Sequence, residues 1–274
     1  MAMTLELSLP PRAPVKLLQL SDCHFLEQPG DTLMGVDTEQ SFHSVLASLR
    51  QNPNWPADLI LLTGDLVQNP TRNAYQRLFR HLRNIDIPWV CLPGNHDDLS
   101  LIREILCREK AHCSKRILAG RWQILCLNSK LPDSHAGHLA AEELDFLAQS
   151  LAQNPIPTLV ALHHPPLPVG STWMDTMQLD NSEQLFSVLN HYPHVRGIIF
   201  GHIHQVFEVS HNGIPLWSVP STCFQFKPKS SDFALDELPP GWRWLKLQPD
   251  GRIDTWVERL DACPPGLDFS QSGY

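Results

Sequence analysis

The sequence lacks several features that would assign it to a specialised class of protein. No apolar run approaches the roughly 20 residues that a membrane-spanning helix needs. The first residues, MAMTLELSLPPRAPVKLL, contain no basic segment followed by an apolar one, so no signal peptide is predicted. The seven cysteines include no C-x-x-C pair, which fits reduced thiols in a cytosolic chain better than a disulfide framework. These absences favour a cytoplasmic protein.

Positive charge is also in short supply. The chain has 21 Lys and Arg residues against 29 Asp and Glu residues, which gives a formal net charge of -8. Affinity for nucleic acid depends on many basic side chains that neutralise phosphates, so a general nucleic-acid binder is disfavoured. With 274 residues, 42% hydrophobic and 18% charged, the chain has the composition of a globular protein and the length of one large domain, residues 1–274.

Apolar runs alternate with segments of helical periodicity over most of the chain. Strands are predicted within 15–22, 57–65, 87–97, 121–129, 157–165 and 195–204, and helices behind a cap at Asp37, over 73–85, over 99–110 and around Leu147 and Leu185. From about residue 205 the pattern becomes β-rich, with a hairpin within 242–260 and an irregular tail from about 262. This order predicts an α/β protein with two mixed sheets packed together and helices outside.

Polar clusters occur where nearly every predicted strand ends. They are Asp22 with His24, Gly64 with Asp65, the run GNHD at 94–97, the run HHPP at 163–166, and the run GHIH at 201–204. Ligands of α/β sheets bind outside the carboxyl ends of the strands, so these clusters are expected to meet at one edge.

Each cluster alone has an ordinary structural explanation, such as an exposed strand end or a proline-stiffened loop. In a strand, His202 and His204 would share one face while Ile203 points into the core, and Asp22 and His24 would do the same around Cys23. Five such clusters at successive strand ends favour a shared site over five coincidences.

The series D-x-H, G-D, G-N-H-D, H-x-P and G-H-x-H resembles that of the calcineurin-like metallophosphoesterase superfamily. The resemblance implies a four-layer α/β/β/α sandwich. The stretches TGDLVQ, HHPPLPVG, FGHIHQ, PSTCFQFKP and PPGWR extend it to the bacterial 3',5'-cyclic AMP phosphodiesterase family over almost the whole chain. The implied activity is hydrolysis of 3',5'-cyclic AMP to 5'-AMP, which regulates the level of the cyclic nucleotide.

The resemblance also implies two metal ions per chain. The implied ligands of the first ion are Asp22, His24, Asp65 and His204, and Asp65 would bridge to a second ion held by Asn95, His163 and His202. His163 is chosen over His164 because the family's ligand lies two residues before a proline, here Pro165. His164 would then be a supporting or structural residue.

This ligand set suits a hydrolase. Two carboxylates, four imidazoles and one amide leave about two positive charges when two divalent ions bind, so the site attracts anions even though the protein is acidic. Such ions lower the pKa of bound water, and the resulting hydroxide would attack phosphorus. The donor types suit Fe, Mn, Zn or Co rather than Ca, and the resemblance implies Fe²⁺, with Mn²⁺ as a replacement.

His96 follows Asn95 directly and is the candidate for assisting the leaving group as a general acid, although a purely orienting role is also open. The resemblance implies that substrate contacts His24, Asp65, Asn95, His96 and His204. Asp97 is a candidate for orienting His96.

The loops 25–36 and 166–181 follow strands that carry metal ligands and are expected to overhang the site. Trp173 and Met174 are candidates for stacking on a base or for packing, and Phe226 and Lys227 for approaching substrate or for surface contacts. Two other functions stay open: hydrolysis of another phosphoester, such as a glycerophosphodiester, a 2',3'-cyclic nucleotide or a monoester, and a non-catalytic scaffold.

Overall fold

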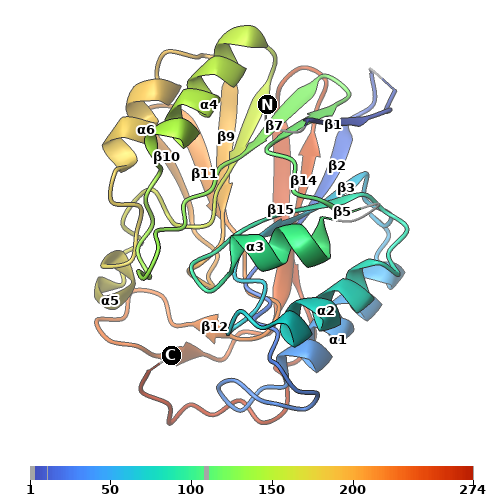
Figure 1. The fold of residues 1–274 in the computed structure, drawn as a ribbon, viewed down its shortest axis with the longest axis vertical. Coiled ribbons are helices and arrows are strands. Elements are labelled where there is room, and N and C mark those ends of the chain that lie inside the picture. Colours follow the sequence, from blue (N-terminus) through green and yellow to red (C-terminus); the bar gives the residue numbers. More distant parts are fainter. Residues whose placement is uncertain (1–3, 11, 108–110, 274) are drawn as a thin grey trace.

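The computed structural model describes residues 4–10, 12–107 and 111–273, and within them two large mixed sheets form the centre of the molecule (Figure 1). The seven-stranded sheet has the order β1 (Thr4–Leu7), β6 (Arg116–Ala119), β7 (Trp122–Cys126), β8 (Thr158–Ala161), β9 (Val195–Phe200), β11 (Ile214–Ser218) and β10 (Glu208–His211). The six-stranded sheet has the order β15 (Ile253–Arg259), β14 (Gly241–Leu247), β2 (Val15–Leu20), β3 (Leu59–Thr63), β4 (Trp89–Leu92) and β5 (Ala111–His112). A small pair, β12 (Gln225–Phe226) and β13 (Leu235–Asp236), lies outside both.

Helices cover the outer faces of the two sheets. The helices are α1 (Thr38–Gln51), α2 (Arg72–Leu82), α3 (Leu99–Leu101), α4 (Ala141–Gln153), α5 (Thr172–Asp175) and α6 (Ser182–Leu189). In Figure 1, α4 and α6 lie at the upper left and α1 and α2 at the lower right. Asp37 caps α1 as predicted, because its side chain accepts a hydrogen bond from the amide of Gln40 at 2.9 Å.

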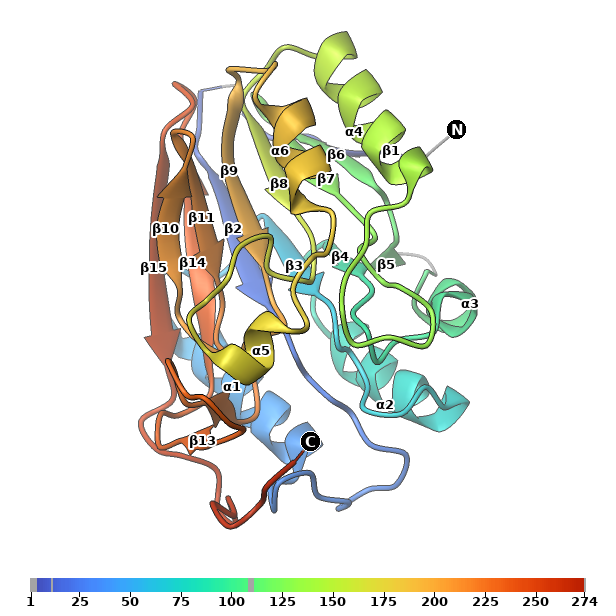
Figure 2. The same ribbon diagram turned by 90° about the vertical axis from the view of Figure 1, so that its left-hand side faces the viewer.

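The two-residue period of the strands divides the core into three layers of apolar side chains. In β3, Leu59 and Leu61 face the other sheet, whereas Ile60 and Leu62 pack beneath α1 and α2. On the seven-stranded sheet, Val160 of β8 likewise packs under α4 and α6. One apolar layer between the sheets and one under each set of helices confirm the predicted α/β/β/α sandwich (Figure 2).

Three local features differ from the predictions. The helix expected over 99–110 is α3 followed by a π-helical segment, Ile102–Leu106, and its last residues lie outside the described part. The short strands β1, β6 and β10 had no clear signal in the sequence. The expectation of reduced thiols is wrong for Cys107 and Cys113, which form a disulfide with their Cα atoms 5.6 Å apart, a separation typical of such a bond. Cys23, Cys91, Cys126, Cys223 and Cys263 are free.

Parallel pairing brings the carboxyl ends of the strands that precede the polar clusters to one edge. β2, β3 and β4 are parallel neighbours in one sheet, and β7, β8 and β9 are parallel neighbours in the other. Gln19 at the end of β2 joins the two sheets there, since its side-chain amide donates to the carbonyl of Phe200 at 3.1 Å. Among the described residues, no helix has both the length and the apolar character needed to cross a membrane.

Candidate metal centre

The loops after five strands bring seven polar side chains together at this edge. Asp22 and His24 follow β2, Asp65 follows β3, Asn95 follows β4, His163 follows β8, and His202 and His204 follow β9. We call Asp22, His24, Asp65, Asn95, His163, His202 and His204 the donor cluster. All seven are buried, with Asn95 the most exposed at 9%.

The backbone of this edge is not extended, which corrects the strand-based prediction. β9 ends at Phe200, and both His202 (φ 70°) and His204 (φ 47°) adopt the left-handed conformation. Asp22, His24 and Asp65 do the same, with φ values of 55°, 46° and 48°. Non-glycine residues rarely adopt this conformation, and they do so mainly where surrounding structure imposes it at functional sites. Ile203 and Cys23 are nevertheless buried as predicted.

Hydrogen bonds from neighbouring segments hold these left-handed turns. The hydroxyl of Ser221 donates to the carbonyl of Asp22 at 2.8 Å, and the hydroxyl of Thr38 donates to the carbonyl of His24 at 2.8 Å. The amide of His202 donates to the carboxylate of Asp22 at 3.0 Å, which ties the end of β9 to the end of β2. The turns are therefore fixed by residues distant in sequence.

The cluster contains two groups of converging donor atoms. In the first, Nε2 of His24 lies 3.1 Å from Nε2 of His204, which lies 3.5 Å from Oδ1 of Asp22. In the second, Oδ1 of Asn95 lies 3.1 Å from both Nε2 of His163 and Nδ1 of His202, and these two nitrogens are 3.2 Å apart.

Asp65 lies between the two groups. Its Oδ2 is 3.2 Å from Nε2 of His163 and 3.9 Å from Nε2 of His24. Its Oδ1 accepts a hydrogen bond from the amide of His96 at 3.0 Å, which fixes the carboxylate plane. One oxygen of this carboxylate is thus available to both groups.

The hydrogen bonds of two imidazole rings show which ring nitrogens can bind a cation. Nδ1 of His163 lies 2.8 Å from the carbonyl of Thr63, and Nδ1 of His204 lies 2.9 Å from the carbonyl of Phe224. Each Nδ1–H donates to its carbonyl, so in the neutral ring the Nε2 lone pair points into the cluster. Nε2 of a neutral His163 would then face Oδ1 of Asn95, also an acceptor, so a proton or a cation is needed between the two atoms. The donor set can hold two metal ions.

Burial and mutual charge shift the pKa values of the cluster strongly. Burial raises the pKa of Asp22 to about 7, partly offset by His163. Burial opposes the charged form of His163, but the carboxylates of Asp65 and Asp22 outweigh it and raise the pKa to about 9. Burial lowers the pKa of His204 to about 3. The protein alone therefore holds a proton on His163 that a cation would displace.

His96 lies beside the cluster and is partly exposed. Its ring centroid is 5.3 Å from that of His24, and its Nδ1 lies 2.9 Å from the carbonyl of Gln68. Asp97, suggested from the sequence as an orienting residue for His96, contacts the two loops beside it. Its carboxylate accepts hydrogen bonds from the amides of Gly94 and Leu66 and from the hydroxyl of Tyr75, so it holds the loops after β3 and β4 together.

The neighbouring histidines differ in their surroundings. Nδ1 of His164 lies 2.8 Å from the hydroxyl of Ser129, and its ring centroid is 5.0 Å from that of His202. The sequence interpretation missed His135, whose Nδ1 is 3.2 Å from Nδ2 of Asn95. His135 lies in the irregular segment after β7, which ends at Cys126, so it is too far from the strand end for the rule that identified the other clusters to find it.

The two loops expected to overhang the site behave differently. Trp173 and Met174 line a cavity beside Asn95 and His202, together with Phe226. The loop 25–36 instead contacts the C-terminal tail, where the amide of Asp268 donates to the carbonyl of Met34 at 3.0 Å.

Comparisons with known proteins identify the family and agree with the fold. Residues 15–206 match the family model of calcineurin-like phosphoesterases. The chain is 40% identical to the 3',5'-cyclic adenosine monophosphate phosphodiesterase CpdA of Escherichia coli K12 over 98% of both chains. It is 38% identical to a 3',5'-cyclic-nucleotide phosphodiesterase of Nostoc sp. over 93% of this chain and 95% of that protein.

A solved structure shares the fold at much lower identity. A dimetal phosphatase from Danio rerio aligns with 90% of this chain and 99% of its own, with a TM-score of 0.58 and 15% sequence identity. The family model and the two relatives cover the strand ends that carry the donor cluster. The chain belongs to the calcineurin-like phosphoesterase family.

Proposed function

We propose that the protein hydrolyses the phosphodiester of 3',5'-cyclic AMP to 5'-AMP and so controls the level of this nucleotide. The observation that carries the proposal is the position of Asp65, whose Oδ2 is shared between two groups of donor atoms. The names of the relatives that match nearly the whole chain support the cyclic nucleotide as the substrate.

In this proposal, Asp22, His24, Asp65 and His204 hold one ion, and Asp65, Asn95, His163 and His202 hold the other. Two divalent ions in such a site supply a water molecule of lowered pKa and neutralise charge on the phosphoryl oxygens. We infer Fe²⁺ as the resident ion, with Mn²⁺ as a replacement, because the family resemblance implies it; the imidazole, carboxylate and amide donors suit both metals and equally suit Zn and Co.

The side chains of the cluster also position the substrate. The phosphate would contact His24, Asp65, Asn95, His96 and His204. His96 lies at the outer side of the cluster, where its ring is held by the carbonyl of Gln68, and it would donate a proton to the departing ester oxygen. We propose a cytoplasmic location: five cysteines are free thiols, as is usual there, and the Cys107–Cys113 disulfide is the exception.

A substrate panel tests the proposal. The protein loaded with Fe²⁺ or Mn²⁺ is incubated with 3',5'-cyclic AMP, 3',5'-cyclic GMP, a 2',3'-cyclic nucleotide, a glycerophosphodiester and a phosphomonoester, and kcat/KM is compared. The expected result is the highest kcat/KM for a 3',5'-cyclic nucleotide. Asp65→Ala and His204→Ala serve as matched controls, and cyclic AMP turnover no higher than theirs would refute the proposal.

A further inference from the structure

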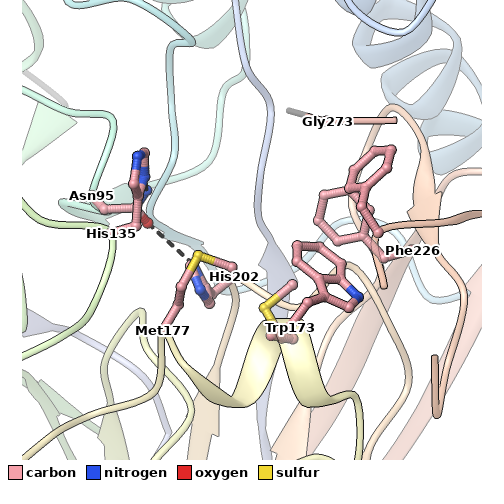
Figure 3. A pocket seen from close by; sticks show the side chains of 9 residues that line it. Asn95, His135, Trp173, Met177, His202, Phe226 and Gly273 are labelled. Atoms are coloured by element: carbon pink, nitrogen blue, oxygen red, sulfur yellow. Dashed lines mark hydrogen bonds between the residues drawn. The ribbon is translucent and has the colours of Figure 1, made fainter. Parts of the chain in front are cut away.

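A cavity of about 180 Å³ adjoins the donor cluster on one side. Its lining comes from the segment after β8, from the β12–β13 hairpin, from Gly273, and from the loops after β4, β7 and β9. Figure 3 shows Trp173 and Phe226 facing Met177 and His202 across the cavity, with Asn95 beside His202. We call this space the aromatic cavity.

The aromatic cavity and the donor cluster share residues, so one ligand can occupy both. Asn95 and His202 line the cavity, and their Oδ1 and Nδ1 atoms, 3.1 Å apart, belong to the second donor group. The ring of Phe226 stacks on that of His204, with centroids 4.2 Å apart and planes 19° apart. A group in the cavity therefore lies within reach of a phosphate held by the cluster.

The walls of the aromatic cavity suit a flat, uncharged ring. Trp173 packs edge-on against Phe226 and Phe233, with centroid distances of 5.1 and 5.4 Å, which gives a rigid aromatic wall. Met177 adds a polarisable thioether. No Asp, Glu, Lys or Arg is among the described residues that line it.

Size and polarity separate this cavity from a second hollow beside His96. Ligand pockets usually have about 300–1,000 Å³, so the aromatic cavity fits one ring system and not a whole nucleotide. The other hollow, of about 560 Å³, is lined by polar residues such as His96, Asp98, Lys130 and Asp133. A neutral purine gains more from aromatic surfaces than from charged side chains in water.

We infer that the aromatic cavity is the base subsite and that it takes the adenine ring of the substrate, with Trp173 as its main specificity residue. This inference rests on the proposed function, because it needs a phosphate at the donor cluster. It assigns Met177 and Phe233 to the same subsite, and it leaves the polar hollow beside His96 to the sugar and to solvent.

The experiment compares two substrates that differ only in the base. One is 3',5'-cyclic AMP, and the other is the 3',5'-cyclic phosphate of methyl riboside, which keeps the sugar and the phosphodiester. Replacement of Trp173 by Ala should lower kcat/KM for cyclic AMP by about 10-fold or more, as expected for the loss of one base stack. The loss for the base-free analogue should stay within about threefold.

Two control variants separate base binding from folding. Trp173→Phe keeps an aromatic surface and should recover most of the kcat/KM for cyclic AMP. Trp256→Ala removes another partly buried tryptophan, on β15, and should leave kcat/KM unchanged for both substrates. Metal content and the melting temperature are measured for each variant. Equal losses on both substrates, or no loss on cyclic AMP, would overturn the inference.

A binding measurement keeps the inference separate from the proposed function. If the metal-loaded native protein hydrolyses neither substrate, the proposed function fails, and calorimetry with cyclic AMP then tests the cavity directly. Affinity for cyclic AMP that falls about 10-fold or more in Trp173→Ala would support a base subsite. Unchanged affinity, or no binding to the native protein, would overturn it.

Discussion

His96 differs from the donor cluster in what its ring contacts. Its backbone amide holds Asp65, whereas its Nδ1 is turned towards the carbonyl of Gln68. The side chain can therefore be removed without removing the amide that fixes the bridging carboxylate.

His96→Ala should keep both metal ions and lower kcat by about 10² to 10⁴, the usual contribution of a general acid. Elemental analysis gives the metal content and steady-state kinetics gives kcat. Asp65→Ala is the contrasting variant and should lose tight binding of both ions. Loss of metal from His96→Ala would show that the ring acts as a ligand.

Metal binding should depend on pH through two residues of the cluster. The pKa of Asp22 is raised to about 7 and that of His163 to about 9, so at pH 7 the protein alone carries a proton on His163 and is about half protonated at Asp22. Metal ligands must be deprotonated, so binding should release about one to two protons at pH 7, and affinity should rise between pH 6 and 8. Calorimetry in buffers of different ionisation enthalpy measures the release; affinity independent of pH would contradict this prediction.

At the scale of the elements, the site depends on close contact between strand ends. Gly201 follows β9 and packs against the end of β2. A Cβ atom there would collide with the hydroxyl of Ser21 and would lie 2.8 Å from the carbonyl of Thr63 and 3.0 Å from Oδ2 of Asp22. Glycine at this position lets the two sheets approach each other.

Gly201→Ala should push the end of β9 away from β2, with the loss of metal binding and about 1–3 kcal/mol of unfolding free energy. Gly30→Ala is the control for metal content, because nothing lies within 4 Å of its Cβ position and it should retain metal, although its φ of 80° makes alanine cost some stability there. Chemical denaturation and elemental analysis measure both effects. Full metal content in Gly201→Ala would show that the edge tolerates a wider gap.

The sequence predicted the position of most strands, and from them the meeting of the polar clusters, because the period of apolar residues and the direction of parallel strands set both. It could not predict the backbone conformation of the ligands. The positive φ angles of His202 and His204 depend on contacts with segments such as Asp22, which is 180 residues away from His202. The strand pattern therefore predicted the wrong backbone conformation for these two histidines, although it predicted correctly the edge of the sheet at which they lie.

The contacts made by the loops could also not be predicted from the sequence. His135 lies in an irregular segment, and nothing in its neighbours indicates that its ring contacts Asn95. The disulfide between Cys107 and Cys113 depends on their Cα separation, and spacing alone does not determine it.

For the whole molecule, the donor cluster joins the two sheets. Asp22, His24, Asp65 and Asn95 follow strands of the six-stranded sheet, and His163, His202 and His204 follow strands of the other. Each proposed ion would take ligands from both sheets, so bound metal should stabilise the sandwich as a unit.

Removal of metal by a chelator should lower the melting temperature on the order of 10 °C. A ligand at about 1,000 times its Kd stabilises a protein by about 4 kcal/mol, and 1 kcal/mol shifts the melting temperature of a chain of this size by about 2–4 °C. Differential scanning calorimetry with and without chelator measures the shift. Asp65→Ala, which should not retain the ions, serves as the control, and an equal response in both proteins would contradict a metal effect.

The donor cluster also bears on how this chain can evolve, because it combines left-handed turns with buried imidazoles and carboxylates. In the protein alone they cost free energy, since strained backbone and buried ionisable groups oppose folding. A descendant that gave up its chemistry could exchange these residues for apolar ones and gain robustness. The seven residues of the donor cluster therefore lower the stability of the protein alone, and selection would keep them only for a function at this edge.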